Sequence, residues 1–390
     1  MLKNYFLLRM PKEQYYEEDI ERWNRRFTKR FNDLDGCFQN LLNFEIQFFE
    51  LYNTACLCIP GSPDARKYLT HSLNAGYAYT RLATEENLKL TFEIDEHRVE
   101  LESAYEKEAF RICGYWDERV QKALLLRHHE ALMSFLRLDP KVLEREVRSG
   151  SDPALCLFAE VYRSLFSNRK YLGTLFYAAK RAFERHVKDP SNHYRLFYSQ
   201  IELIQALLSG EGEAAFNAAL EQALLTHRDY YANNRPDYWP GVTALPIAAI
   251  AALAFDHYGY RVTVENEYLP QWIIDDRAGN PPWKIGEKSL GFSPADSINF
   301  QSVEDELRYL EENDLEAQLE HIEEHLDFLL RWDDPMEFIP AVFPHLWHIY
   351  LTKTDYRFGG DGTALKQYIQ ANRPAIADEL NKERPSARQQ

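Results

Sequence analysis

Cysteine is scarce in this sequence and follows no spacing pattern. The 390 residues contain five cysteines, Cys37, Cys56, Cys58, Cys113 and Cys156. An odd and scattered set does not match the disulfide framework of a small secreted protein, and Cys56 and Cys58 lack the second cysteine pair of a zinc finger. We therefore expect a chain that folds without structural disulfides in a reducing compartment.

A hydrophobic run of membrane-spanning length is also missing. The apolar run from Ala244 to Phe255 has 12 residues, whereas a spanning helix needs about 20. Residues 1–19 have too short an apolar run, and no small-residue cleavage site, for a secretory signal peptide. We therefore expect a cytoplasmic protein with no membrane partner. The apolar run is predicted to be a buried helix, with Pro246 in its first turn and Gly259 after its end.

Basic residues are in deficit, and the motifs of common enzyme classes are absent. The 45 Lys and Arg residues face 61 Asp and Glu residues, for a net charge of -16, which argues against direct binding of nucleic acid. The sequence has no P-loop, no dinucleotide fingerprint and no G-x-S-x-G elbow, and the glycine-rich run 359–362 lacks the Lys and Ser or Thr of a phosphate loop. We therefore predict a protein that is not an enzyme and that binds no cofactor and no metal.

The sequence does contain helical periodicity along most of its length. Apolar residues recur at spacings of three and four, with short turns between segments, as in antiparallel helical hairpins. The predicted helices span 17–52 (broken near Gly36), 66–84, 116–138, 153–166, 172–186, 194–208, 212–231, 243–258, 303–332 and 335–352, with a loop at 59–64. Alternating apolar residues predict a small β-hairpin near 88–101. The predicted fold is mainly α, made of packed helical hairpins, with an N-terminal region at 1–150 and a C-terminal region at 151–380.

Negative charge is concentrated in residues 301–330, which hold eleven acidic residues and one basic residue. Like charges at helical spacing repel, so such a helix needs compensation. One interpretation is a solvated face; the other is a docking surface for a basic partner, where complementary charge speeds association. The candidate partner-binding residues here are Glu304, Asp305, Glu311, Glu312, Glu316, Glu320 and Glu323.

The longest irregular segment, 275–299, carries two aromatic residues that offer a second candidate contact. Trp283 and Phe292 either bind a partner or pin the loop to its own domain, because an aromatic side chain in a long loop serves either purpose.

One motif leaves an enzyme alternative open. His321, Glu324 and His325 match H-x-x-E-H, in which two histidines on one helical face hold zinc and the glutamate acts as base. The helix around it is so rich in Glu that a chance match on a solvated face is the simpler explanation. A zinc hydrolase therefore stays an alternative of lower weight.

Three blocks of sequence carry a resemblance to a known family. They are the run from Trp116 to Pro140, the run from Ala215 to Tyr231, and the run from Ala248 to Asp256, which Gly259 and the corner Tyr268-Leu269-Pro270 follow. In order and approximate spacing these blocks resemble the immunity protein 49 family of bacterial polymorphic toxin systems. The resemblance, including the strand-like segment ahead of the first block, covers about residues 88–275.

The resemblance implies a non-enzymatic inhibitor that stays in the producing cell. Such a protein binds a cognate toxin domain, encoded by an adjacent gene and delivered by kin cells, and blocks it; the toxins are often nucleases. A related family, the immunity proteins of PoNe DNase toxins, has a similar helical character. A helical-repeat interaction scaffold is the other alternative: Ala178 to Phe183 resembles one tetratricopeptide element, although the chain has no regular 34-residue period.

Overall fold

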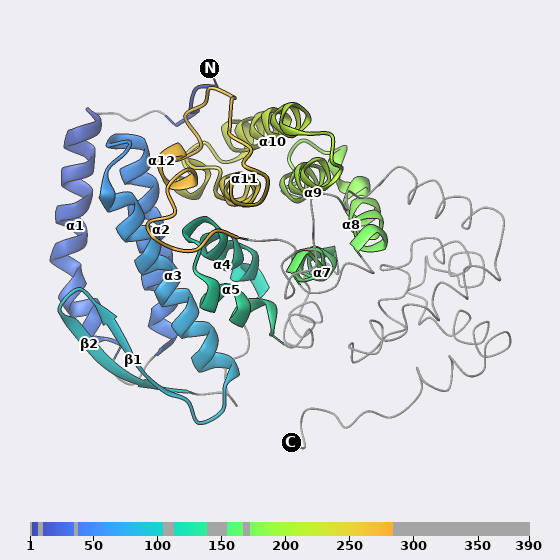
Figure 1. Ribbon diagram of the computed structural model, residues 1–390. Helices are drawn as coiled ribbons and strands as arrows, with labels where there is room; N and C mark the ends of the chain where they lie inside the picture. The colour runs from blue at the N-terminus through green and yellow to red at the C-terminus, as the bar shows by residue number, and fades with distance from the viewer. Residues whose placement is uncertain are drawn as a thin grey trace, which may run out of the picture. The chain divides into compact units, whose positions relative to one another are not determined.

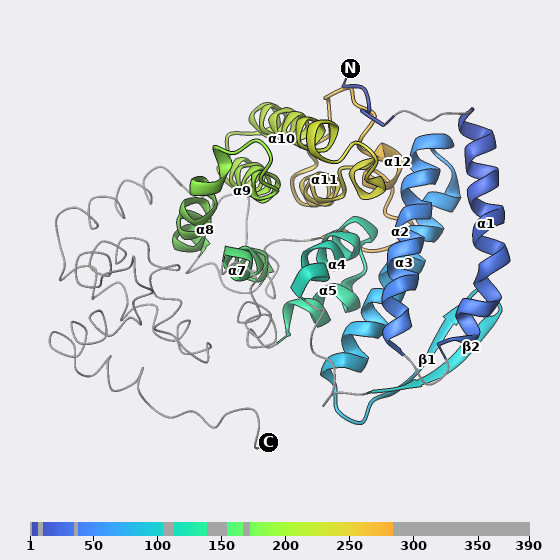
Figure 2. The same ribbon diagram turned by 180° about the vertical axis from the view of Figure 1, so that it is seen from behind.

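The computed structural model describes residues 2–6, 11–34, 38–103, 113–138, 154–166 and 172–283, which form helices and one two-stranded sheet (Figures 1 and 2). The prediction of a mainly α fold with a small β-hairpin is confirmed. The chain divides into two compact units. Unit 1 comprises Met1–Leu138, Asp189–Leu207 and Glu211–Lys284, and unit 2 comprises Asp139–Lys188, Leu208–Gly210 and Ile285–Gln390. The division into regions 1–150 and 151–380 stays a prediction.

Three helices lie side by side at one side of unit 1 in both views (Figures 1 and 2). They are α1 (Lys12–Asn32), α2 (Leu41–Cys58) and α3 (Pro63–Thr84), with the 3₁₀ turn η1 (Phe38–Asn40) ahead of α2. The break predicted near Gly36 therefore separates α1 from α2. Aromatic rings join these two helices, because Trp23 of α1 meets Phe48 of α2 edge to face at 5.0 Å between ring centroids.

The predicted start of α3 is wrong by three residues. We expected a loop over 59–64 and a helix from residue 66, but α3 begins at Pro63. The Ser62 hydroxyl accepts a hydrogen bond from the backbone N–H of Asp64 at 3.2 Å, and proline occupies the first turn. A serine N-cap followed by proline stabilises a helix start, so the local signal was present in the sequence.

The β-hairpin is confirmed close to its predicted place. Strands β1 (Lys89–Ile94) and β2 (His97–Glu102) pair antiparallel, with Phe92 opposite Val99. The buried Phe92 side chain stacks on Phe31 of α1 at 6.4 Å between ring centroids. The hairpin therefore covers the C-terminal end of α1 (Figure 1).

The predicted helical segment 116–138 is two helices, α4 (Cys113–Leu126) and α5 (His129–Leu136). Between them, Arg127 adopts a left-handed backbone with φ of 56°. Its buried guanidinium pairs with Asp256 at 3.0 Å and donates to the carbonyl oxygen of Ile273 at 2.9 Å. These long-range bonds stabilise a break that local periodicity does not reveal.

The remaining elements of unit 1 are α9 (Tyr194–Leu208), α10 (Glu213–Asn234), the 3₁₀ turn η4 (Trp239–Gly241), α11 (Leu245–Tyr258) and α12 (Gln271–Ile274). The prediction of a buried apolar helix is confirmed in α11, which has Pro246 in its first turn and ends at Gly259 with φ of 74°. Among the described residues, the stretch Trp239–Tyr258 is long and apolar enough to cross a membrane, and 72% of its most apolar window is buried inside the protein.

Unit 2 is described over two helices, α7 (Ala154–Phe166) and α8 (Leu172–Val187), which pack together. Phe158 and Phe183 meet edge to face at 6.2 Å between ring centroids. These helices confirm the predictions at 153–166 and 172–186. The predicted helices 303–332 and 335–352, with the acidic segment, Phe292 and the H-x-x-E-H motif, lie outside the described residues.

Candidate functional site

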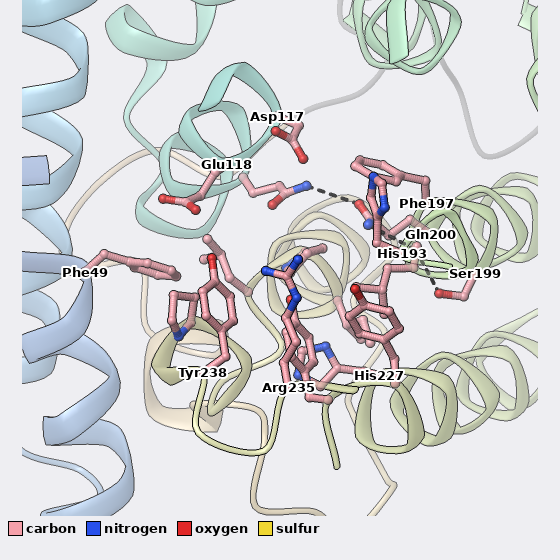
Figure 3. A pocket seen from close by; sticks show the side chains of 18 residues that line it. Phe49, Asp117, Glu118, His193, Phe197, Ser199, Gln200, His227, Arg235 and Tyr238 are labelled. Atoms are coloured by element: carbon pink, nitrogen blue, oxygen red, sulfur yellow. Dashed lines mark hydrogen bonds between the residues drawn. The ribbon is translucent and has the colours of Figure 1, made fainter. Parts of the chain in front are cut away.

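A pocket of about 290 Å³ opens within unit 1, and Figure 3 shows the side chains around it. Helix α4 supplies carboxylates, helices α9 and α10 supply imidazole and aromatic rings, and the segment between α10 and α11 supplies the rim. The lining residues are Phe49, Asp117, Glu118, Gln121, His193, Leu196, Phe197, Ser199, Gln200, His227, Tyr230, Tyr231, Arg235, Tyr238, Pro240, Leu245, Pro246 and Ile247.

A buried ion-pair network, which we call the Glu45 cluster, fixes α4 against α2. It consists of Glu45, Arg119 and Lys122, whose side chains are all fully buried. Arg119 Nη2 lies 2.6 Å from one Glu45 carboxylate oxygen, and Lys122 Nζ lies 3.3 Å from the other. Burial raises the pKa of Glu45, but the two cations outweigh that effect and hold its pKa below the ordinary value.

Helix α3 leaves room for this cluster at Gly76. A Cβ atom at this position would lie 2.5 Å from Glu45 Oε1 and 2.9 Å from Arg119 Nε. Thr80, one turn further along α3, accepts a hydrogen bond from Arg119 Nη1 at 3.1 Å. Three helices therefore meet around one carboxylate, which sets the rotation of α4 and the direction in which its acidic residues point.

Asp117 and Glu118 form the acidic wall of the pocket, at the top of Figure 3. Glu118 pairs with Lys122 at 2.5 Å, and its side chain is 27% exposed. Asp117 has no ion-pair partner among the residues that the structure describes. Burial and, second, the neighbouring Glu118 carboxylate raise the pKa of Asp117 to about 7. The pocket wall therefore carries a carboxyl group that binds its proton more tightly than an ordinary aspartate does.

A hydrogen bond between two glutamines joins α4 to α9 at the side of the pocket. Gln121 Nε2 donates to Gln200 Oε1 at 3.1 Å, and Gln200 in turn donates to the carbonyl oxygen of Leu196 at 3.1 Å. Both glutamine side chains are buried. Because each amide has its partner, this side of the pocket is held in one arrangement.

Stacked tyrosines form the opposite wall, in which Tyr231 and Tyr238 line the pocket and Tyr5 packs behind Tyr231. Tyr5 stacks on Tyr231 at 6.2 Å, and Tyr231 stacks on Tyr238 at 5.9 Å, each pair within 8° of parallel. The Tyr5 hydroxyl also donates to the carbonyl oxygen of Tyr238 at 3.1 Å. The N-terminal segment is attached beside this column, since the N–H of Leu2 donates to the carbonyl oxygen of Glu265 at 2.7 Å. Residues 2–6 therefore brace the aromatic wall.

The floor of the pocket is neutral, whereas its rim carries a positive charge. At the floor, His227 Nε2 lies 2.8 Å from the Gly241 carbonyl oxygen, and burial lowers the pKa of His227 to about 4, so the imidazole is neutral at pH 7 and donates. At the rim, the exposed Arg235 lies over the Tyr238 ring at 5.3 Å. Tyr238 is itself 42% exposed. The pocket thus combines two carboxylates, one peripheral cation and several ring faces.

The family model of immunity protein 49 matches residues 60–273, which is more than half of the chain. This protein belongs to the immunity protein 49 family. The match confirms the resemblance and extends it upstream of residue 88. Every pocket residue except Phe49 lies inside the matched range. No curated protein and no solved structure matches the chain. Membership in this family implies an immunity role through a toxin partner.

Of the predicted partner-binding residues in this immunity protein, the structure describes Trp283. Its side chain is 1% exposed, its indole N–H donates to the Leu124 carbonyl oxygen at 2.9 Å, and its ring stacks on His129 at 4.0 Å. These contacts fit the interpretation that the ring pins the loop to its own domain. The role of Trp283 in partner binding stays a prediction, as do those of the acidic residues at 304–323 and Phe292, which lie outside the described residues.

Sequence reasoning did not single out the pocket residues of this immunity protein. Asp117 and Glu118 lie in the block that carries the family resemblance, but 61 acidic residues occur in the chain and local sequence does not mark these two. Within the described residues, no group of three His, Cys, Asp or Glu side chains could hold a metal ion. The H-x-x-E-H motif falls outside that part of the chain.

Proposed function

We propose that this protein is an immunity protein that binds and neutralises a cognate toxin domain encoded by an adjacent gene, in the cytoplasm of the producing cell and its kin. The family match over residues 60–273 carries this proposal. The pocket supports it, because an open site with the exposed aromatic residue Tyr238 at its rim offers a residue type on which tight protein interfaces depend. The proposed mode of action is binding without catalysis.

A nuclease domain is a toxin class whose expected surface charge fits this proposal. Enzymes that act on nucleic acid present basic surfaces to the phosphate backbone. The net charge of -16 on this chain is opposite in sign, so it would speed encounter with a basic toxin domain. The same charge disfavours direct binding of this protein to nucleic acid.

Co-expression with the product of the adjacent gene tests the proposal. The toxin domain is expressed from an inducible promoter with this protein or with an empty vector, and host survival and co-purification are scored. We expect killing in the vector control, survival with this protein, and a stable complex on size exclusion. The expected salt dependence is weaker binding at higher ionic strength, because screening reduces charge steering.

An unrelated helical protein of similar acidity, expressed at the same level, is the matched control for this experiment. It separates specific neutralisation from nonspecific binding of a basic protein. Killing that persists in the presence of this protein, with no complex, would contradict the proposal for that gene pair. Survival without a complex would contradict neutralisation by direct binding.

A further inference from the structure

The acidic wall of the pocket holds one carboxyl group, that of Asp117, with no ion-pair partner among the described residues. The nearby cation Lys122, which favours its ionised form, is paired with Glu45 and Glu118. Behind the wall, the carboxylates of Glu45 and Glu118 are matched by the cations of Arg119 and Lys122. A partly buried carboxylate without a partner is costly. An incoming cation would remove that cost.

We propose that the pocket receives one positively charged side chain, Arg or Lys, of the partner toxin, held between Asp117 and Glu118 on α4 and the aromatic wall opposite. The inference rests on the proposed function and names the chemistry of its contact. The pocket volume of about 290 Å³ accommodates one long side chain. Figure 3 shows the two carboxylates facing the open space, with Phe49 and Tyr238 on one side and Phe197 on the other.

The ring faces add a second attraction for a cation. Aromatic rings attract ammonium and guanidinium groups through their negative faces, most strongly where water is excluded. The protein already uses this interaction at the edge of the pocket, since Lys122 Nζ lies 4.7 Å from the centroid of Phe49 and Arg235 lies 5.3 Å from that of Tyr238. The rings of Phe49 and Tyr238 therefore already interact with cations of the protein itself, and the proposed side chain would add a further cation beside them.

Arg235 is a cation of the protein itself that lies at the rim of the same pocket. It is exposed at the rim and forms no ion pair with Asp117 or Glu118 in the described structure. If the pocket accepts a cation, Arg235 repels that cation, and its removal strengthens binding. If the pocket instead accepts an acidic group of the partner, Arg235 is the residue that binds it, and its removal weakens binding. The sign of the Arg235 effect therefore identifies the charge of the occupant.

The raised pKa of Asp117 predicts a pH dependence for this contact. The charged and titratable groups around the pocket are Glu118 and Lys122 of α4, His193 just before α9, His227, Tyr230 and Tyr231 of α10, and Arg235 and Tyr238 at the rim. A bound cation lowers the pKa of Asp117, so binding releases its proton. With a free-protein pKa of about 7 and a carboxyl that stays ionised in the complex, affinity rises by up to about tenfold from pH 6 to pH 8.

The test measures the affinity of the full-length protein for the toxin domain of the adjacent gene by isothermal titration calorimetry. The variants are Asp117→Asn, Glu118→Gln and Arg235→Gln, and the matched control is Glu221→Gln on the exposed face of α10. We expect at least about tenfold weaker binding for Asp117→Asn and for Glu118→Gln. Arg235→Gln is expected to bind more tightly, and Glu221→Gln like the wild type. Asp117→Asn should also lose the rise in affinity from pH 6 to pH 8.

Thermal melting of each variant separates binding from folding, because a structural role would lower both the melting temperature and the affinity. Weaker binding by Arg235→Gln, or wild-type binding by both carboxylate variants, would overturn the inference while leaving the immunity role intact. Absence of binding by the wild-type protein would overturn the proposed function itself. Replacement of each exposed Arg and Lys of the toxin by Met then identifies the side chain whose loss is not additive with Asp117→Asn.

Discussion

Neighbouring faces of helix α4 carry charge in two different ways. In the Glu45 cluster, every charged group has a partner within 3.3 Å and no exposure to solvent. At the pocket, Asp117 has a raised pKa and no ion-pair partner within the described residues. The first arrangement stabilises the packing of three helices. In the second arrangement, the free protein lacks an ion pair that a cation of a partner could form with Asp117 on binding, as is typical of binding sites.

The largest expected effect comes from removal of the carboxylate at the centre of the cluster. Glu45→Ala leaves Arg119 buried without its carboxylate and removes one of the two partners of Lys122. We expect a loss of about 3–5 kcal/mol in the free energy of unfolding, because an unpaired buried charge is strongly destabilising. Urea denaturation followed by circular dichroism measures this loss.

Glu50→Ala is the matched control, since Glu50 lies on the same helix and is exposed. Its effect should stay within about 0.5 kcal/mol. Equal losses for the two variants would show that the Glu45 cluster does not stabilise the fold, and the contrast between the two faces of α4 would disappear.

A smaller effect is expected at Gly76, where the cluster meets α3. In Gly76→Ala the new methyl group would lie 2.5 Å from Glu45 Oε1, and the forced displacement costs about 1–3 kcal/mol. Alanine favours the helix over glycine by about 1 kcal/mol, so the net loss is expected to be about 1 kcal/mol.

The same substitution in a Glu45→Ala background sharpens the comparison. There the carboxylate that meets the new methyl group is gone, so the helix propensity of alanine should dominate and the substitution should cost less or stabilise. Denaturation of the single and double variants measures this coupling. An equal cost of Gly76→Ala in both backgrounds would mean that the strain arises elsewhere than at Glu45.

Much of the fold follows from local signals in the sequence. Apolar spacing located most helices to within a few residues, alternation located the β-hairpin, and Pro246 and Gly259 marked the limits of α11. Errors occurred where a local cap was overlooked, at Ser62, or where long-range bonds override periodicity, at Arg127. Periodicity indicates which face of a helix is apolar. It does not indicate which distant carbonyl and carboxylate groups accept hydrogen bonds from the Arg127 guanidinium.

The pocket could not be predicted in the same way. Phe49 and Ile247 both line it although nearly 200 residues separate them, so its shape depends on how several helices pack. The property that distinguishes Asp117 is the lack of an ion pair within the described residues, and whether Arg119 and Lys122 pair with Glu45 or with Asp117 is decided only in three dimensions. The sequence instead favoured residues 301–330 as a binding site, because a high density of charged residues can be recognised without knowledge of the fold.

The smallest expected effect is that of Asp117→Asn on the free energy of unfolding. Its sign is opposite to that of Glu45→Ala, so it distinguishes the two faces of α4. The folded-state pKa of Asp117 is about 7, above the value of about 3.9 for an unfolded chain. Between these values the folded state binds more protons than the unfolded state, so this group lowers stability as pH rises from about 4 to 7. Asp117→Asn removes that titration.

The variant should therefore be more stable than the wild type by about 1 kcal/mol at pH 8, because one pKa unit corresponds to about 1.4 kcal/mol and the side chain is only partly buried. The difference should vanish below about pH 3, where the Asp117 carboxyl is protonated in both the folded and the unfolded wild-type chain. Asp237→Asn, an exposed change in the segment before η4, should stay within about 0.5 kcal/mol at both pH values. A less stable Asp117→Asn protein at pH 8 would mean that this carboxylate stabilises the fold as Glu45 does. The pocket would then lack the unpaired carboxylate that a partner cation is proposed to neutralise.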